Sequence, residues 1–154
     1  MQSSAYNNNL QLFQTRDYVA IVTEMIHEAR IVPLDTRPHL AQGVRQWLGD
    51  SRGRWQGQTL VVETTNFRPE KAPFGGSATT RLTERFTRTK ADTLQYEVTI
   101  EDPTTWTKPW TFSLPMAYSK QSLYEYACHE GNYGLFNILS NVGKEREAAN
   151  AKSR

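Results

Sequence analysis

TLQYEVTIED, which spans Thr93–Asp102, sets the fold class because its side chains alternate between apolar and polar. Its apolar set is Leu94, Tyr96, Val98 and Ile100, and its polar set is Gln95, Glu97, Thr99 and Glu101. A period of two is typical of a strand with one buried face and one exposed face. The stretch Thr80–Thr89 is similar, and the short link Lys90-Ala91-Asp92 suits a hairpin. The two stretches therefore predict an antiparallel pair.

Other short stretches of the chain also have the character of strands. They are Leu10–Thr15, Tyr18–Met25, Ala29–Leu34, Thr59–Phe67, Trp110–Met116 and Leu123–Cys128. Turn-forming residues separate the strands, as in Arg16-Asp17, Asp50–Gly57 and Gly75-Gly76-Ser77. About eight short strands without a long intervening helix predict an all-β fold. We expect an antiparallel, lipocalin-like barrel or half-open barrel with room for one small ligand.

The 154 residues fit a single domain. We expect a flexible N-terminal segment over residues 1–9, a barrel-like domain over 10–142 and a polar tail over 143–154. The tail is rich in Lys, Arg, Glu and Ala but has no apolar stripe. A short helix is predicted over Leu40–Leu48, after Pro38.

Composition excludes several classes of protein. A hydrophobic content of 38% with 22% charged residues predicts a folded, water-soluble chain. The 18 basic and 16 acidic residues are interspersed, so we expect no nucleic-acid partner. No apolar run approaches the roughly 20 residues of a membrane span, and the start MQSSAYNNNL does not resemble a signal peptide.

His27 is the first candidate for acid–base chemistry. If the alternation from Val19 to Ile31 is unbroken, His27 faces the interior, where an imidazole can act as a general base. The alternative is a histidine that hydrogen-bonds a neighbour in the core. Glu63 lies in a largely apolar strand, where an enclosed carboxylate needs a partner or takes up a proton. The predicted catalytic residues are His27, Glu63 and Asp50.

The loop GDSRGRWQG, residues 49–57, is the densest polar segment. Its Asp, Ser and Arg side chains suit a hydroxylated or anionic ligand, with tryptophans stacking on it as in sugar binding. The alternative is a tight hairpin turn in which the glycines supply positive φ. The candidate ligand-binding residues here and on the neighbouring strands are Arg52, Arg54, Trp47, Trp55, Glu24 and Arg30.

The connection DPTTWTKPW, Asp102–Trp110, combines two prolines with two tryptophans. Such a stiff segment most often caps the end of a barrel and covers its core. The alternative is an aromatic platform for a ligand, and Trp106 and Trp110 are therefore also candidate ligand-binding residues.

The sequence predicts no metal and no cofactor. Cys128 is the single cysteine, which excludes an internal disulfide and a multi-cysteine zinc site. A histidine site would require His27, His39 and His129 to converge from distant segments. Cys128 and His129 are neighbours on a predicted strand and would point to opposite faces, which disfavours a thiol–imidazole dyad.

Four stretches resemble an uncharacterised family of secreted, β-rich proteins of environmental bacteria, of acidobacterial and planctomycete type. They are YVAIVTEMIHEARIVPLDTRPH (Tyr18–His39), WLGDSRGRWQGQTLVVETTNF (Trp47–Phe67), LTERFTRTKADTLQYEVTIEDPTTWTKPWT (Leu82–Thr111) and YEYACHEGNY (Tyr124–Tyr133). The resemblance implies a periplasmic or secreted protein with a β-rich fold, and it implies no activity. Thr36 departs from the glycine that precedes Arg-Pro-His in the family, which affects the geometry of that loop.

Three functions stay open. The first is binding of a small-molecule ligand inside the barrel, which the abundance of aromatic and polar residues favours slightly. The second is an acid–base enzyme, such as a lyase, isomerase or hydrolase, that uses His27 with Glu63, Glu24 or Asp50 and an arginine. The third is an assembly subunit whose edge strands or tail pair with other copies, so a homo-oligomer is also considered.

Overall fold

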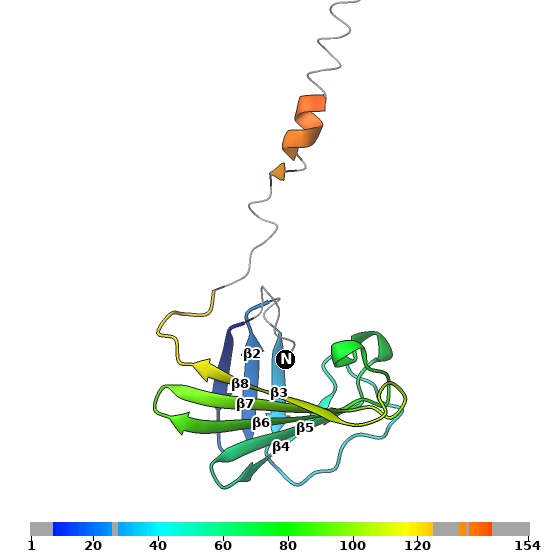
Figure 1. Cartoon of the computed structure of the whole chain (residues 1–154), viewed down its shortest axis with the longest axis vertical. Coiled ribbons are helices and arrows are strands. Elements are labelled where there is room, and N and C mark those ends of the chain that lie inside the picture. Colours follow the sequence, from blue (N-terminus) through cyan, green and yellow to red (C-terminus); the bar gives the residue numbers. More distant parts are fainter. Residues whose placement is uncertain (1–7, 26–27, 125–132, 135, 143–154) are drawn as a thin grey trace, which may run out of the picture. The chain divides into compact units, whose positions relative to one another are not determined.

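The computed structural model describes residues 8–25, 28–124, 133–134 and 136–142. The described strands all belong to one compact unit, Met1–Tyr124, and Glu125–Arg154 form a second unit (Figure 1). Residues 134 and 136–142 of the second unit are helical. Among the described residues, no helix has the length and apolar character needed to span a membrane.

The first unit contains two antiparallel sheets. The small sheet has the strands β1 (Leu10–Gln14), β2 (Tyr18–Thr23) and β3 (Ala29–Pro33). The large sheet has the strands β4 (Asp50–Gln56), β5 (Thr59–Thr65), β6 (Arg81–Lys90), β7 (Thr93–Glu101) and β8 (Trp110–Ala117). Each strand pairs with its neighbour in sequence, so both sheets are meanders. Two short 3₁₀ helices, η2 (Pro69–Lys71) and η3 (Pro73–Gly75), lie between β5 and β6.

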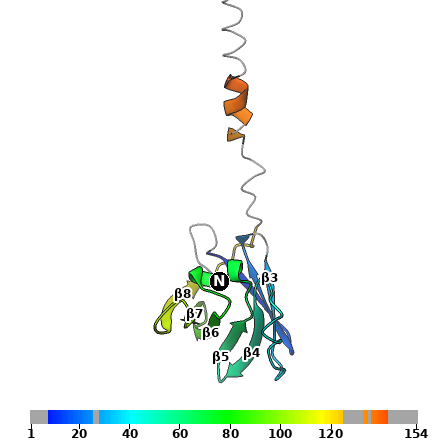
Figure 2. The same ribbon diagram turned by 90° about the vertical axis from the view of Figure 1, so that its right-hand side faces the viewer.

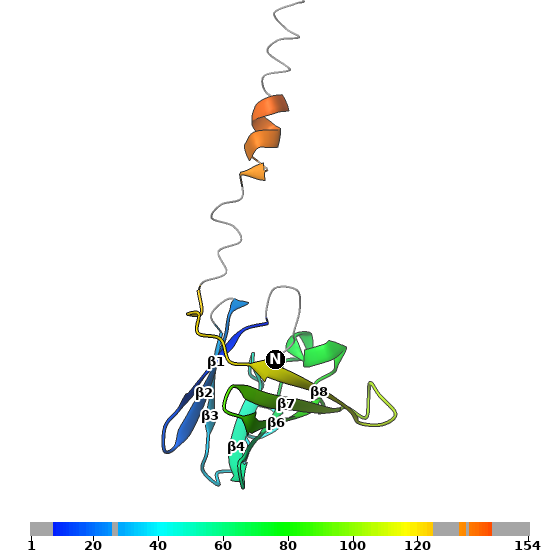
Figure 3. The same ribbon diagram turned by 60° about the vertical axis from the view of Figure 1, so that its left-hand side comes forward.

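The all-β prediction is confirmed, whereas a closed barrel is not. β3 and β4 lie beside each other, as Figure 2 shows, and the small sheet flanks the large one in Figure 3. Within the described part of the chain, no ladder of hydrogen bonds joins β3 to β4 or β8 to β1. The two sheets therefore stay separate in their backbone pairing.

Three expected elements are corrected. Residues 50–57, predicted as a turn, form β4 and the turn that follows it. The sequence pattern did not indicate this strand, because Ser51 and Gly53 stand on its inner face in place of apolar residues. Leu40–Leu48 is not a helix, since the Asn66 side-chain amide binds the carbonyls of Leu40 and Ala41. Leu123 and Tyr124 are outside any strand, and residues 125–128 of that expected strand lie outside the described residues.

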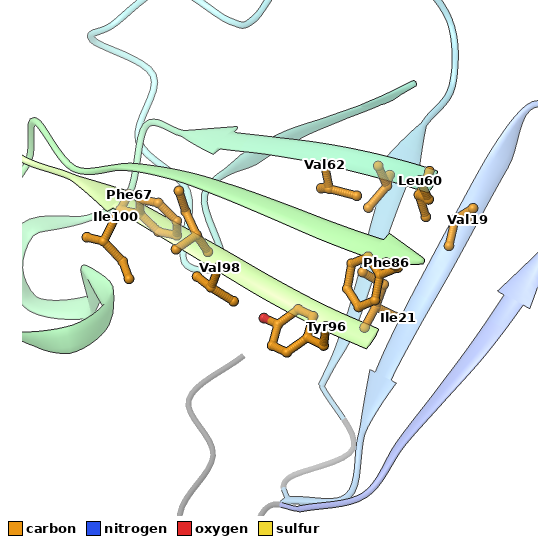
Figure 4. Close-up of a cluster of buried hydrophobic side chains, with 11 residues drawn as sticks. Val19, Ile21, Leu60, Val62, Phe67, Phe86, Tyr96, Val98 and Ile100 are labelled. Carbon is orange, nitrogen blue, oxygen red and sulfur yellow. The ribbon is translucent and has the colours of Figure 1, made fainter. Parts of the chain in front are cut away.

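The core lies where the inner faces of the two sheets meet. The alternation in β7 is confirmed, because Tyr96, Val98 and Ile100 are all buried. Figure 4 shows these side chains with their partners from the other strands. The core cluster also contains Val19, Ile21, Val32, Leu60, Val62, Phe67, Leu82 and Phe86. Burial of this apolar surface is the main force that holds the small sheet against the large one.

Gly53 is required where the two sheets come closest. A Cβ atom at this position would lie 2.8 Å from Leu34 Cδ2 and 2.8 Å from Val32 Cγ1. Real Cβ contacts are not that short, so any larger residue would push β3 away from β4. The glycine in the polar run at residues 49–57 is therefore a packing feature of a strand.

The outer faces of the two sheets differ in polarity. On the large sheet, polar pairs span neighbouring strands, including Thr99–Thr111 at 2.8 Å, Gln95–Ser113 at 2.7 Å and Arg54–Glu63 at 2.9 Å. On the small sheet, Phe13 and Ile31 are 50% and 56% exposed. The large sheet thus presents a hydrated face and the small sheet an apolar one.

Asp102 joins the loop before β6 to the loop after β7. Its two carboxylate oxygens accept hydrogen bonds from the backbone N–H groups of Ser77 and Thr104 and from the hydroxyls of Thr79, Thr80, Thr104 and Thr105. Burial raises the pKa of Asp102, but the hydrogen bonds lower it by more, so the pKa lies well below its ordinary value. Asp102 therefore remains ionised at the end of β7.

Candidate functional site

A cavity of about 340 Å³ opens beside Trp47, between β2, β3 and the segment that follows β5. Its polar lining residues are Thr23, Glu28, Arg30, Trp47, Glu70 and Lys71. The rest of the lining is apolar and comes partly from the core residues Ile21, Phe67 and Leu82. We refer to this space as the Trp47 cavity. It brings together two of the predicted ligand-binding residues, Arg30 and Trp47.

Trp47 is held from two sides by charged residues. Its indole N–H donates a hydrogen bond of 3.0 Å to Glu28 Oε1. The Lys71 ammonium lies 4.1 Å from the centroid of the Trp47 ring, in a cation–π contact. Half of the Trp47 surface remains exposed. The residue is therefore oriented by its neighbours yet accessible.

Arg30 reaches from the cavity into the core. Its Nη2 atom lies 2.6 Å from Glu84 Oε2, and Glu84 is completely buried. The Tyr96 hydroxyl donates a 2.7 Å hydrogen bond to Glu84 Oε1. Burial raises the pKa of Glu84, but the nearby Arg30 guanidinium and the Tyr96 hydroxyl help to outweigh it, and the pKa is lowered to about 2. The interior thus holds an ionised carboxylate.

A larger cleft, of about 1080 Å³, lies between the two outer strands β1 and β8. Its walls include Leu12 from β1, Tyr96 from β7, Met116 from β8 and the predicted ligand-binding residue Glu24. Because Arg30 lines the Trp47 cavity and Tyr96 lines this cleft, Glu84 lies between the two spaces. The pKa of Tyr96 is raised, first by burial and then by the Glu84 charge, so its hydroxyl keeps its proton.

Asp50 forms a second polar site around His39. Asp50 Oδ2 lies 2.9 Å from His39 Nδ1 and accepts the Leu40 N–H at 2.9 Å, while Oδ1 accepts from Arg52 Nη1 at 2.6 Å. Burial raises the pKa of Asp50, but the Leu40, His39 and Arg52 hydrogen bonds lower it by more. An ionised carboxylate only accepts hydrogen bonds, so His39 Nδ1 carries the proton. In the neutral ring, Nε2 is then the nitrogen with the lone pair, and no described residue donates a hydrogen bond to it.

Gly49 fixes the backbone that leads into this second site. Its φ is +71°, in the left-handed region, and a Cβ atom there would lie 2.6 Å from Thr64 Cγ2 and 2.8 Å from the Thr65 carbonyl oxygen. A side chain at position 49 would therefore displace Asp50, which follows it, from His39.

The remaining predicted residues are dispersed over the first unit. Glu63 is not enclosed, because one third of its side chain is exposed and it pairs with Arg54 on the outer face of the large sheet. Trp55 is 46% exposed and lines neither cavity. Trp106 and Trp110 pack edge to face, 5.8 Å apart, against the core, as the capping interpretation predicts.

His27 lies outside the described residues, and so does His129. Among the described residues, β2 ends at Thr23 and β3 begins at Ala29, so the strand expected over Tyr18–Met25 stops two residues short. In the described part of the chain, no group of three or more His, Cys, Asp or Glu side chains is arranged to hold a metal ion.

Three residues of these sites were missed in the sequence, Glu28, Lys71 and Glu84, and His39 was considered only as a metal ligand. Glu84 could have been recognised from the sequence, because it falls on the same buried face of β6 as Leu82 and Phe86. Lys71 could not, because it lies in a short 3₁₀ helix whose approach to Trp47 depends on the tertiary fold. Comparisons of the chain with protein-family models, with curated proteins and with solved structures gave no match.

Proposed function

We propose that the protein binds a small hydroxylated molecule with one acidic group in the Trp47 cavity. The observation that carries this proposal is the convergence of Arg30, Trp47, Lys71 and Glu28 on one mostly apolar cavity of about 340 Å³. That volume lies within the usual range of ligand pockets, which combine apolar walls with a few converging polar groups. The proposal also takes the two sheets as a half-open barrel. It further places the protein in a secreted or periplasmic setting, which the family resemblance supports.

Each polar residue has a distinct role. Glu84 already neutralises Arg30 at 2.6 Å, so Lys71 is the cation for an acidic group on the ligand. Glu28 uses Oε1 for the Trp47 indole, which leaves its Oε2 to accept a hydrogen bond from a ligand hydroxyl. Trp47 supplies a flat apolar surface beside both groups.

Galacturonic acid and galactose test this proposal, because they differ only in the acidic group. We expect galacturonic acid to bind with a dissociation constant of about 1 mM and galactose about 10-fold more weakly. Trp47→Ala should weaken the binding of galacturonic acid by about 10-fold or more, since it removes the ring and releases Glu28. Calorimetric titration gives these constants.

Trp55→Ala is the matched control, because Trp55 has nearly the same exposure as Trp47 (46% against 50%) and does not line the cavity. It should leave the affinity unchanged. Equal losses in the two variants, or no saturable binding of either sugar, would contradict the proposal.

Acid–base catalysis at His39 is a second candidate, and the His39–Asp50 hydrogen bond of 2.9 Å favours it. A carboxylate that holds Nδ1 and leaves Nε2 as a base is the arrangement of many hydrolases. Hydrolysis of p-nitrophenyl acetate tests it. We expect His39→Gln to lower the rate above buffer by about 100-fold, and Asp92→Asn, an exposed acid in the β6–β7 turn, to leave it unchanged. A wild-type rate equal to that of His39→Gln would reject this candidate.

A further inference from the structure

β1 is an outer strand without the features that normally protect a sheet edge. Its sequence is LQLFQ, with no charged residue and no proline. The other outer strands differ, because β3 contains Arg30 and Pro33, β4 contains two arginines, and β8 contains Pro115. Charges and prolines on edge strands prevent pairing with further strands. β1 is therefore the outer strand of this fold that is best suited to pair again.

The backbone N–H and C=O groups of three β1 residues point away from β2. The Thr15 N–H donates to the Tyr18 carbonyl, and the Glu24 N–H donates to the Asn9 carbonyl. Odd-numbered residues thus face β2, and the alternation of an antiparallel ladder turns the even-numbered ones to the open side. The N–H and C=O groups of Leu10, Leu12 and Gln14 point to that side. Among the described residues, none of these three has a backbone partner outside the β2 ladder.

Apolar surface adjoins this edge. Leu12 is 36% exposed, and Phe13 and Ile31 on the outer face of the small sheet are 50% and 56% exposed. The outer face of the large sheet, by contrast, carries polar pairs that span neighbouring strands. A partner strand beside β1 would cover part of this apolar surface.

We propose that β1 pairs antiparallel with β1 of a second copy of this chain, about a two-fold axis at Leu12. Only even-numbered residues can exchange hydrogen bonds, and this register overlaps all five residues of the strand. Leu12 then lies opposite the partner subunit's Leu12, and Leu10 lies opposite the partner subunit's Gln14. Such pairing forms about six backbone hydrogen bonds and joins the two small sheets into one.

Charge complementarity at the ends of the paired strands supports a second copy as the occupant. Arg16 follows β1 in the turn to β2, and this register brings it to the partner subunit's Asn8. The Glu24 carboxylate is held at that end of the strand by a 2.9 Å hydrogen bond from Asn9 Nδ2. Arg16 of each copy therefore approaches Glu24 of the partner subunit, twice by symmetry, with Asp17 one residue further into the turn.

The expected dimer is weak, because pairing of one strand edge buries less surface than a standard interface. We expect a dissociation constant on the order of 50 µM, measured on the full chain by sedimentation between about 5 and 500 µM. Leu12→Lys should raise this constant by about 10-fold or more, since two like charges face each other across the axis. Leu12→Glu should do the same.

The register also predicts how a mixture of these two variants behaves. Equal amounts of Leu12→Lys and Leu12→Glu should form a heterodimer at least as tightly as the wild type dimerises, because opposite charges then face each other. Val44→Lys is the control: Val44 is 49% exposed and does not line the cleft beside β1, so its change should leave dimerisation intact. Thermal melting of each variant separates loss of pairing from loss of folding.

A wild-type chain that stays monomeric at about 500 µM would overturn the proposal. A dimer that survives Leu12→Lys, or variants that fail to restore each other when mixed, would place the contact elsewhere and overturn it as well. The measurement reads mass alone, so its outcome is independent of sugar binding in the Trp47 cavity.

Discussion

Arg30→Met should lower the free energy of unfolding by about 4 kcal/mol at neutral pH. The change removes the guanidinium that lies 2.6 Å from Glu84 Oε2, while the Glu84 carboxylate keeps no exposed surface. A buried charge that loses its partner costs far more than the pair contributes as a whole. Urea unfolding followed by circular dichroism measures the effect.

Arg54→Met is the matched control, because Arg54 also pairs with a glutamate, at 2.9 Å, but both side chains are partly exposed. Water already screens that pair, so its loss should cost less than about 1 kcal/mol. The double variant Arg30→Met/Glu84→Gln should recover more than half of the loss, since a neutral amide can still accept the Tyr96 hydroxyl. Equal losses of unfolding free energy in Arg30→Met and Arg54→Met would contradict the claim that burial sets the cost of losing the arginine.

The Glu84 pair also predicts a dependence on pH. Its folded pKa of about 2 lies below the ordinary value of 4.5, so protonation favours the unfolded chain. The stabilisation is fully present above about pH 4.5 and is lost as the pH falls towards about 2. In Arg30→Met the buried carboxylate gains from protonation instead. The gap between the two proteins should therefore narrow on acidification, and a constant gap would refute this account.

Asp102→Asn should lower the free energy of unfolding by about 3 kcal/mol. Both Asp102 oxygens accept hydrogen bonds, and the Ser77 N–H, 2.6 Å from Oδ2, cannot reverse its direction. An amide group at this place would turn a donor towards other donors. The loops before β6 and after β7 would then lose their common anchor, which a urea titration detects.

Asp92→Asn serves as the control for this change, since Asp92 is exposed in the β6–β7 turn and an asparagine suits a turn equally well. It should leave the unfolding midpoint unchanged. If Asp102→Asn behaved in the same way, the hydrogen bonds around Asp102 would not contribute to stability.

Most strands could be predicted from sequence because alternation is a local property. Leu94 to Ile100 and their polar neighbours determine one face of β7 without reference to the rest of the chain. β4 was missed because its own residues do not show this alternation. Its inner face has Ser51 and Gly53, and the need for a small residue at 53 arises only from the approach of Val32 and Leu34.

The sites depended on tertiary structure to a greater degree. Arg30 and Trp47 were recognised by residue type, but their common cavity exists because η2 brings Lys71 over the Trp47 ring. Asp50 was recognised as a polar residue, whereas its partner His39 comes from a loop without a periodic pattern. Residue type thus indicated chemistry, and the fold decided which groups meet.

The meander order of both sheets bears on how the chain folds. Within each sheet every strand pairs with its neighbour in sequence, and apart from the β5–β6 connection over residues 66–80 the hairpins close short loops at a small entropic cost. Contacts between near neighbours are typical of faster-folding topologies. The longest link between consecutive strands, residues 34–49, joins β3 of the small sheet to β4 of the large one. Arg30 and Glu84 come from the two sides of that link, so their charges lose water together only when the two sheets close on each other.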